Sequence, residues 1–256
     1  MPRRNPGCKQ LVRVKTRVLS LARRLVAHAG FDLVRLDPEH VPELRRPFLL
    51  EQRSIDVLVD VGANDGTISR RARASGFAGR IVAFEPAAGP FATLASVAES
   101  DPLMDAWQLA LSSSTGEAVL HIAANTSSSS LLEMGQRHLD AAPKSGYIDE
   151  EHVSTARLDD VLRQVIDDGS RVYLKIDVQG AEFDVLAGAE ELLRVTEVVD
   201  CELSLVPLYV GGARWSEVVE HLIARGYGLR WLEPVLYDET TGELLQVDGL
   251  FVRTVA

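Results

Sequence analysis

The sequence predicts one α/β domain built around a mostly parallel sheet with helices on both of its faces. Short β-branched apolar runs alternate with helical patterns over most of the chain, as they do in βαβ units. A glycine-containing turn at residues 62–66 follows the first of these runs and precedes a helical pattern. The last two apolar runs are separated only by a turn, so we expect them to form a closing antiparallel pair.

The hydrophobic periodicity gives each element an expected range. Strands are expected at residues 55–61, 80–84, 105–111, 117–122, 171–176, 195–203, 227–232 and 244–252. Helices are expected at residues 67–75, 89–99, 157–168, 182–193 and 215–225. Gly76 and Gly226 follow two of these helices and are typical stop residues.

Two segments show no clear period. Residues 38–53 contain prolines among mixed residues, which is typical of a linker. Residues 123–152 are polar and rich in serine, and an irregular stretch of this length is usually a lid or a binding loop. We therefore expect an N-terminal segment of residues 1–53 and a main domain of residues 54–256 that carries the lid or acceptor loop.

Charge is distributed unevenly along the chain. The net charge is −10, yet residues 1–30 hold eight Lys and Arg and no acid, so the remaining residues carry −18. Apolar residues in this basic segment recur every three or four positions, which predicts an amphipathic helical arm that ends at Gly30. The arm could pack on the domain or on a second subunit in a homodimer. Contact with a membrane surface and an organelle transit peptide are the alternatives.

Composition excludes several classes of protein. The body of the chain is too acidic to suggest a nucleic-acid surface. No apolar run approaches the ~20 residues of a membrane-spanning helix. Cys8 and Cys201 are too few for a disulfide scaffold or a thiolate zinc cluster, and they suit the reducing cytoplasm.

The loop after the first strand favours S-adenosylmethionine over a dinucleotide. Its glycines let the backbone approach a ligand, and the next helix presents free N–H groups to an anionic group. The spacing is Gly-Ala-Asn-Asp-Gly and not Gly-x-Gly-x-x-Gly. A carboxylate at Asp60 would repel a pyrophosphate but could receive the ammonium of a methionine moiety. The residues expected to touch the cofactor here are Asp60, Gly62, Ala63, Asn64, Gly66 and Thr67.

The next two strand ends supply the expected adenosine contacts. Glu85 follows the second strand, 25 residues after Asp60, where a carboxylate can accept both ribose hydroxyls. Pro86 fixes the direction in which the chain leaves that strand. Ala110, at the end of the third strand, could line the adenine through its backbone.

The fourth strand end carries the expected chemistry. Asp177 ends a buried strand in the predicted ligand crevice, and Lys175 shares its face because the two residues are two positions apart. Asp177 could act as general base or bind a metal. Together with Glu202 and Asp248 it could hold a divalent ion such as Mg²⁺ through oxygen ligands.

A histidine is the usual alternative base. His121 ends the strand before the lid, and His138 and His152 lie within the lid. We rank His121 first of the three, although a histidine in such a position is more often a surface residue than a catalyst.

These residues resemble a known family, the FkbM-type S-adenosylmethionine-dependent methyltransferases. The resemblance covers roughly residues 55–253. It rests on the segments VDVGANDGTIS at 59–69, VAFEPAAGPFATL at 82–94, SSL at 129–131, RLDDVL at 157–162, YLKIDVQGAEFDVLAGA at 173–189 and DGLFV at 248–252. Gln179 departs from the family, which more often has Glu there, and this shifts weight to Asp177 and Glu182.

The resemblance implies a Rossmann-like class I methyltransferase that methylates a hydroxyl of a sugar, an oligosaccharide or a glycosylated natural product. A polyketide or macrolide hydroxyl is the alternative acceptor, although the polar lid favours a sugar. The chain has no Asn-Pro-Pro-Tyr, the signature expected for methylation of amino groups. A nicotinamide-dependent oxidoreductase and a non-catalytic cofactor-binding protein are the alternatives from other classes.

Overall fold

The computed structural model describes residues 23–24 and 26–254, which belong to two compact units, residues 1–45 and 46–256. In the first unit, a 3₁₀ helix η1 spans Pro42–Leu44, and Gly30 has a φ of +80°. Most of the helix expected in the basic arm lies outside the described residues. Among the described helices, none is long and apolar enough to cross a membrane.

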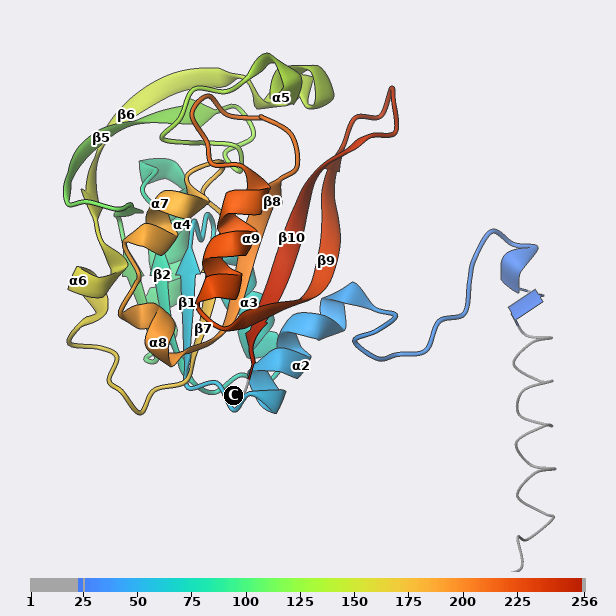
Figure 1. The fold of residues 1–256 in the computed structure, drawn as a ribbon, viewed down its shortest axis with the longest axis horizontal. Helices are drawn as coiled ribbons and strands as arrows, with labels where there is room; N and C mark the ends of the chain where they lie inside the picture. Colours follow the sequence, from blue (N-terminus) through green and yellow to red (C-terminus); the bar gives the residue numbers. More distant parts are fainter. Residues whose placement is uncertain (1–22, 25, 255–256) are drawn as a thin grey trace, which may run out of the picture. The chain divides into compact units, whose positions relative to one another are not determined.

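The second unit is built on a seven-stranded sheet with the order β3-β2-β1-β7-β8-β10-β9 (Figure 1). The first five strands in this order pair in parallel, whereas β10 runs antiparallel to both β8 and β9. The predicted Rossmann-like fold with a closing antiparallel pair is therefore confirmed. The strands are β1 (Val57–Val61), β2 (Arg80–Phe84), β3 (Met104–Trp107), β7 (Val172–Ile176), β8 (Thr196–Ser204), β9 (Tyr227–Tyr237) and β10 (Leu244–Arg253).

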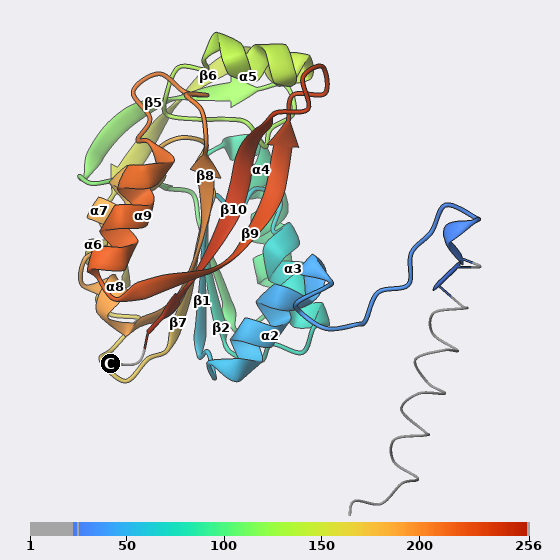
Figure 2. The same cartoon turned by 45° about the vertical axis from the view of Figure 1, so that its right-hand side comes forward.

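Helices cover both faces of this sheet because its central strands are apolar on both sides. In β1, Val57, Val59 and Val61 face one apolar cluster, and Leu58 faces the other. The first face is covered by α6 (Leu158–Leu162), α7 (Glu182–Ala187), α8 (Leu192–Val195) and α9 (Trp215–Ala224). The second is covered by α2 (Arg45–Gln52), α3 (Thr67–Ala74) and α4 (Ala88–Glu99), and Figure 2 shows α2 and α3 side by side.

The segment expected as an irregular lid is partly regular. It contains α5 (Gln136–Ala141), η2 (Pro143–Ser145) and the start of β6 (Tyr147–Ala156). β6 lies between β4 (Ala110–Leu111) and β5 (Gly116–Ala123) in a second, three-stranded sheet. Strand β6 was not predicted because its first half is mostly exposed and charged, so that its sequence pattern resembles that of a loop.

Other expected boundaries were also wrong. Residues 45–52 form helix α2 and not a linker, because Leu49 and Leu50 pack into the core. The expected strand at 105–111 is divided between β3 and β4. The helix expected at 157–168 ends at Leu162. The helix expected at 182–193 is interrupted at Gly188, where a Cβ would lie 2.2 Å from the Ser112 carbonyl oxygen.

Candidate active site

The loop after β1 brings three strand ends together. Gly62 has a φ of +79°, and a Cβ at this position would lie 1.8 Å from the backbone oxygen of Asp177, which follows β7. The N–H groups of Gly62 and Ala63 donate to the carbonyl of Phe84, the last residue of β2, at 3.0 and 2.9 Å. Only glycine fits this approach, so the spacing seen in the sequence has a steric cause.

Glu85 is held by backbone donors beside this loop. Its Oε2 accepts a hydrogen bond from the Asn64 N–H at 2.8 Å, and its Oε1 accepts one from the Ala87 N–H at 2.9 Å. The side chain is buried, and burial raises the pKa of this carboxyl. Each carboxylate oxygen can accept a further bond, so the fixed side chain keeps acceptor capacity for two ligand hydroxyls.

A pocket opens between these strand ends and the lid. Six of the residues predicted to bind the cofactor line it, namely Gly62, Asn64, Glu85, Pro86, Ala110 and Asp177. Its apolar wall is formed by Leu109, Leu111 and Leu120, and the lid contributes Thr126, Ser127, Ser129, Ser130 and Leu131. The pocket thus combines an apolar wall with carboxylates and hydroxyls, which suits a nucleoside.

Four predicted cofactor residues do not line this pocket. Asp60 is buried in β1, and its Oδ2 has no hydrogen-bond partner. Burial raises the pKa of Asp60 to about 7, although the charge of the neighbouring Lys175 opposes this rise. Thr67 donates its hydroxyl to Asp65 at 2.6 Å, while Ala63 and Gly66 shape the loop.

Asp177 and Lys175 lie together, as their spacing predicts. Lys175 Nζ is 3.1 Å from Asp177 Oδ2, and the lysine side chain is 4% exposed whereas that of Asp177 is 36% exposed. Burial alone would lower the pKa of Lys175, but the charges of Asp177, Asp248 and Asp200 outweigh it and raise this pKa. Lys175 is therefore an ammonium that holds Asp177, and Asp177 is the group that reaches the pocket.

The structure does not gather the three acids expected to bind a metal. Asp248 Oδ2 accepts a hydrogen bond from Arg46 Nη2 at 2.8 Å. Glu202 Oε2 accepts hydrogen bonds from the amides of Gln179 and Gln246, at 2.8 and 2.9 Å. Among the described residues these three acids do not form a group of metal-capable side chains. The expected metal site of Asp177, Glu202 and Asp248 is therefore corrected: Asp177 and Glu202 share the Gln179 amide, and Asp248 pairs with Arg46.

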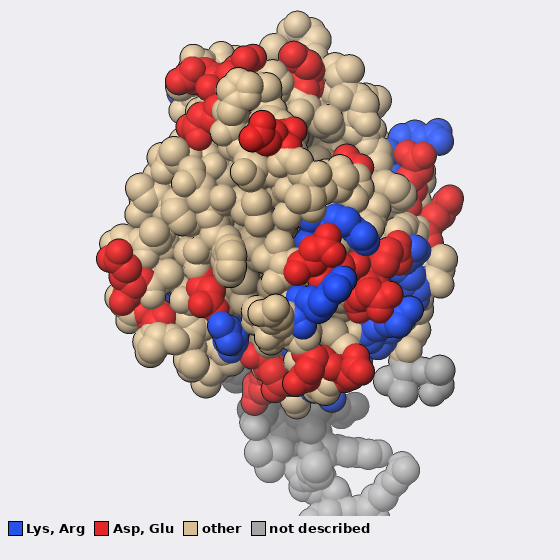
Figure 3. Space-filling view, turned by 90° about the vertical axis from the view of Figure 1, so that its left-hand side faces the viewer, with Lys and Arg blue, Asp and Glu red and all other residues tan. Residues whose placement is uncertain are grey.

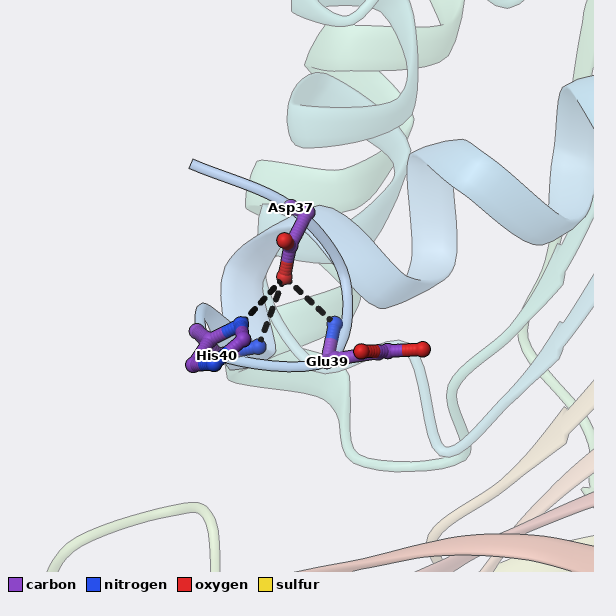
Figure 4. Close-up of side chains that lie close together, drawn as sticks. All are labelled: Asp37, Glu39 and His40. Atoms are coloured by element: carbon purple, nitrogen blue, oxygen red, sulfur yellow. Dashed lines mark hydrogen bonds and ion pairs between the residues drawn. The ribbon is translucent and has the colours of Figure 1, made fainter. Parts of the chain in front are cut away.

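One group of three metal-capable side chains does occur among the described residues, in the N-terminal unit. Ligand atoms of Asp37, Glu39 and His40 lie within 4.8 Å of one another (Figure 4). Asp37 Oδ1 already accepts the backbone N–H groups of Glu39 and His40, at 3.1 and 3.0 Å, and faces His40 Nδ1 at 2.7 Å. These are the hydrogen bonds of a turn, and we assign no metal to it.

None of the three candidate histidines lines the pocket. The His121 ring stacks on Tyr147 with 4.9 Å between centroids, and its Nδ1 lies 3.3 Å from Glu150. His138 is buried in α5, and neither of its ring nitrogens has a hydrogen-bond partner. His152 is exposed on β6.

Several polar residues on this side of the sheet were not predicted as site residues. Gln179 was noted only as a departure from a family pattern, and Arg46, Tyr209 and Gln246 were not noted. Gln179 donates to both Asp177 and Glu202 and accepts from Tyr209. Contacts between residues far apart in the sequence cannot be predicted from a local pattern; Arg46 and Asp248, for example, are 202 residues apart.

The sheet order, the glycine loop and the acid-lined pocket define a Rossmann-like domain of the class I methyltransferase type. Residues 60–229 match the model of the methyltransferase FkbM domain, and the chain belongs to this family.

The chain is also similar to individual proteins. The chain is 35% identical over 156 residues to "Methyltransferase sdnD" of Sordaria araneosa; the match covers 52% of this chain and 60% of that protein. The methyltransferase FkbM of Methylobacillus flagellatus KT is 14% identical, with a TM-score of 0.45 over 76% of this chain and 43% of that chain. A precorrin-6y C5,15-methyltransferase of Geobacter metallireducens GS-15 is 12% identical. Its TM-score is 0.46, and the match covers 83% of this chain and 87% of that chain.

Proposed function

We propose that this methyltransferase uses S-adenosylmethionine to methylate a hydroxyl of a sugar, an oligosaccharide or a glycosylated natural product. The observation that carries the proposal is the pocket in which Glu85, Gly62 and Asp177 meet at the carboxyl ends of β2, β1 and β7. Ligands of open α/β sheets bind at these strand ends.

The residues of the pocket fit this cofactor. The fixed carboxylate of Glu85 would accept the two ribose hydroxyls. Leu109, Leu111 and Leu120 would flank the adenine ring. The close approach of backbone at Gly62 leaves room for the methionine end beside Asp177. Asp60 stays buried beneath this loop, and its unpaired Oδ2 is an acceptor that the cofactor ammonium or a bridging water would satisfy.

Asp177 is the proposed general base. When bound, the cofactor supplies an electrophilic methyl group on its sulfonium sulfur. An acceptor hydroxyl is a weak acid, so its oxygen attacks more readily when a carboxylate takes its proton. Lys175 and Gln179 each hold one oxygen of Asp177, at 3.1 and 2.8 Å, so the carboxylate keeps one orientation towards the pocket. The serine-rich lid would exclude water.

The surroundings of the pocket favour a neutral acceptor that has both polar and apolar parts. The lid presents hydroxyls, and a second pocket begins at Gly180, lined by Leu208, Tyr209 and Trp215 among others. The face drawn in Figure 3 shows acidic and basic side chains mixed together, and its described residues form no continuous basic patch. This face therefore gives no support for a phosphate-rich acceptor.

Calorimetric titration with S-adenosylhomocysteine tests the cofactor assignment. The wild-type protein should bind with micromolar affinity, and Glu85→Ala should weaken binding by about 100-fold, because hydrogen bonds to a charged group are worth about 1.5–3 kcal/mol each. Glu117→Ala, on the exposed start of β5, is the matched control. Binding of NADH in place of S-adenosylhomocysteine by the folded protein would reject the proposal in favour of an oxidoreductase.

Methyl transfer to a panel of glycosides then tests the acceptor class. A radiolabelled methyl group should appear on sugar hydroxyls in the wild-type protein, and Asp177→Asn should reduce this transfer by at least about 100-fold. Transfer only to unglycosylated polyketide hydroxyls would replace the sugar assignment with the alternative acceptor.

A further inference from the structure

A path of hydrogen bonds connects Asp177 through Gln179 with Tyr209, whose segment is bonded to the lid. The Gln179 Nε2 donates to Asp177 Oδ1 and to Glu202 Oε2, both at 2.8 Å. The Tyr209 hydroxyl donates to Gln179 Oε1 at 2.6 Å. Gln179 and Tyr209 are 8% and 4% exposed, so water does not compete strongly for these bonds.

The backbone around Gln179 is shaped for this arrangement. Gln179 has a φ of +57°, a conformation that non-glycine residues rarely adopt, and its carbonyl accepts the Ser130 hydroxyl at 2.7 Å. Gly180 has a φ of +102°, and a Cβ there would lie 2.8 Å from the Tyr209 ring. The strained turn therefore brings the amide and the tyrosine into contact, and a lid residue holds it.

The lid is also bonded to the segment that carries Tyr209. The Gly135 N–H donates to the Leu208 carbonyl at 2.7 Å, and the Val210 N–H donates to the Glu133 carbonyl at 2.9 Å. These bonds lie on either side of Tyr209, which forms a β-bridge with Met134. In Figures 1 and 2 the loop after β8 reaches the lid beside α5. The position of the Tyr209 hydroxyl thus depends on the lid.

Acidic side chains gather around Gln179, and burial raises the pKa of both Glu182 and Glu202. Asp177, Glu182 and Glu202 all approach it or its neighbour Gly180, and Lys175 is the nearby cation. Asp248 lies opposite Glu202 on β10. One amide N–H₂ group can donate to two carboxylates at once, so it holds Asp177 and Glu202 apart without a charge of its own.

We propose that Gln179 is a positioning residue, which aims the Asp177 carboxylate at the reacting centre and couples that aim to the lid through Tyr209. The inference rests on the proposed function, because it assigns the sulfonium and the acceptor hydroxyl to the space that Asp177 faces. Without the amide, Lys175 alone would orient Asp177 and would draw its carboxylate away from the pocket.

The ratio of the affinities for S-adenosylmethionine and S-adenosylhomocysteine reports how the Asp177 carboxylate is oriented towards the sulfur. The two ligands differ in the methyl group and the positive charge on sulfur, so a carboxylate directed at the sulfur favours the first. Asp177→Asn should remove most of this preference. Gln179→Met, which preserves volume but cannot donate, should reduce it about tenfold while the affinity for S-adenosylhomocysteine changes less than about twofold.

Two further variants separate positioning from general damage. Tyr209→Phe keeps the ring against Gly180 but removes the hydroxyl that donates to Gln179. It should reduce the preference for S-adenosylmethionine by about threefold. Gln164→Met, at an exposed position after α6, should leave it unchanged. Thermal melting of each variant shows whether it is folded.

The outcomes distinguish the two proposals. If the wild-type protein binds neither ligand, the proposed function fails. If it binds both, and the folded Gln179→Met and Tyr209→Phe variants keep the wild-type ratio of affinities, the positioning inference is wrong. Equal weakening of both ligands would likewise reject it, because a merely structural role moves both affinities together.

Discussion

The two halves of the sheet's carboxyl edge satisfy their polar groups in different ways. On the side of β1 and β2, Glu85 is held by backbone N–H groups of Asn64 and Ala87. On the side of β8 and β10, the acids are held by side chains: Gln179 and Gln246 hold Glu202, and Arg46 holds Asp200 and Asp248. One half is thus a site made by main-chain geometry, and the other a site made by long-range side-chain contacts.

This difference has energetic consequences. A backbone-made site is fixed by the loop itself, and it fails when the loop cannot adopt its conformation. A side-chain network keeps buried charges only as long as every partner is present, and removal of one leaves the others unpaired. The two halves should therefore respond to different substitutions.

The largest effect is expected for Gly62→Ala, which breaks the backbone-made half. The added Cβ would lie 1.8 Å from the Asp177 carbonyl oxygen at a φ of +79°, so the loop and the end of β7 must separate. We expect loss of S-adenosylhomocysteine binding and destabilisation of at least about 4 kcal/mol, in the range of severe steric and backbone effects. Calorimetry and urea unfolding measure the two effects.

Gly89→Ala in α4 is the control, because a Cβ there meets nothing within 4 Å. An alanine inside a helix should stabilise the protein by up to about 1 kcal/mol. If Gly62→Ala behaved like this control, the close approach of the three strand ends would not limit the site.

Arg46→Met, the second prediction, breaks the side-chain half. Arg46 donates to Asp200 at 2.6 Å and to Asp248 at 2.8 Å, and Nη1 lies 3.5 Å from Glu233. Burial opposes ionisation of Asp200, but the charges of Arg46 and Lys175 outweigh it and lower the pKa of this carboxyl. Removal of the guanidinium should cost about 3–5 kcal/mol of unfolding free energy.

Urea unfolding at pH 7 measures this cost. Arg163→Met is the matched control, because the Arg163 side chain is 76% exposed and its ion pair with Asp160 should contribute less than about 1 kcal/mol. Similar unfolding free energies for the two variants would mean that the buried cluster contributes no more than a surface pair.

The same contrast explains how much the sequence could predict. The residues of the glycine loop and Glu85 lie within 26 positions, and a strand–loop–helix pattern places them at one edge of the sheet. The network around Asp177 joins Gln179, Tyr209 and Gln246 through Glu202 and the Gln179 amide, and their proximity depends on strand order and on the loop after β8. No local period records these contacts. The sequence predicted the contact of Lys175 with Asp177, two positions further along, but it predicted Glu202 and Asp248 as metal ligands and not as hydrogen-bonded acids.

Burial patterns explain the remaining differences. Central strands such as β2 are buried on both faces, and their apolar runs gave boundaries that agree with the structure. β6 is exposed along its first half, so its charged residues resembled a loop. Helix α2 resembles a linker in the sequence because its apolar residues are few and adjacent. The charged Arg46, which pairs with buried Asp200, also does not look like a core residue in the sequence.

Asp60 lies where the two halves meet, since it is in β1 and pairs in register with Lys175 in β7. Burial raises its pKa to about 7, compared with about 3.9 for an unfolded aspartate. Between these values the folded protein binds a proton that the unfolded chain has released. This group's contribution to stability is therefore greatest below about pH 4 and declines as the pH rises to about 7.

Asp60→Asn removes this titration and gives the third and smallest of these effects. The stability of the variant relative to the wild-type protein should rise by about 3 kcal/mol between about pH 4 and pH 6, and it should level off above about pH 7. Urea unfolding of both proteins across this range measures the difference, in which other titrating groups largely cancel. A difference that is independent of pH would mean that Asp60 stays ionised, paired with Lys175, and that the side-chain network extends into β1.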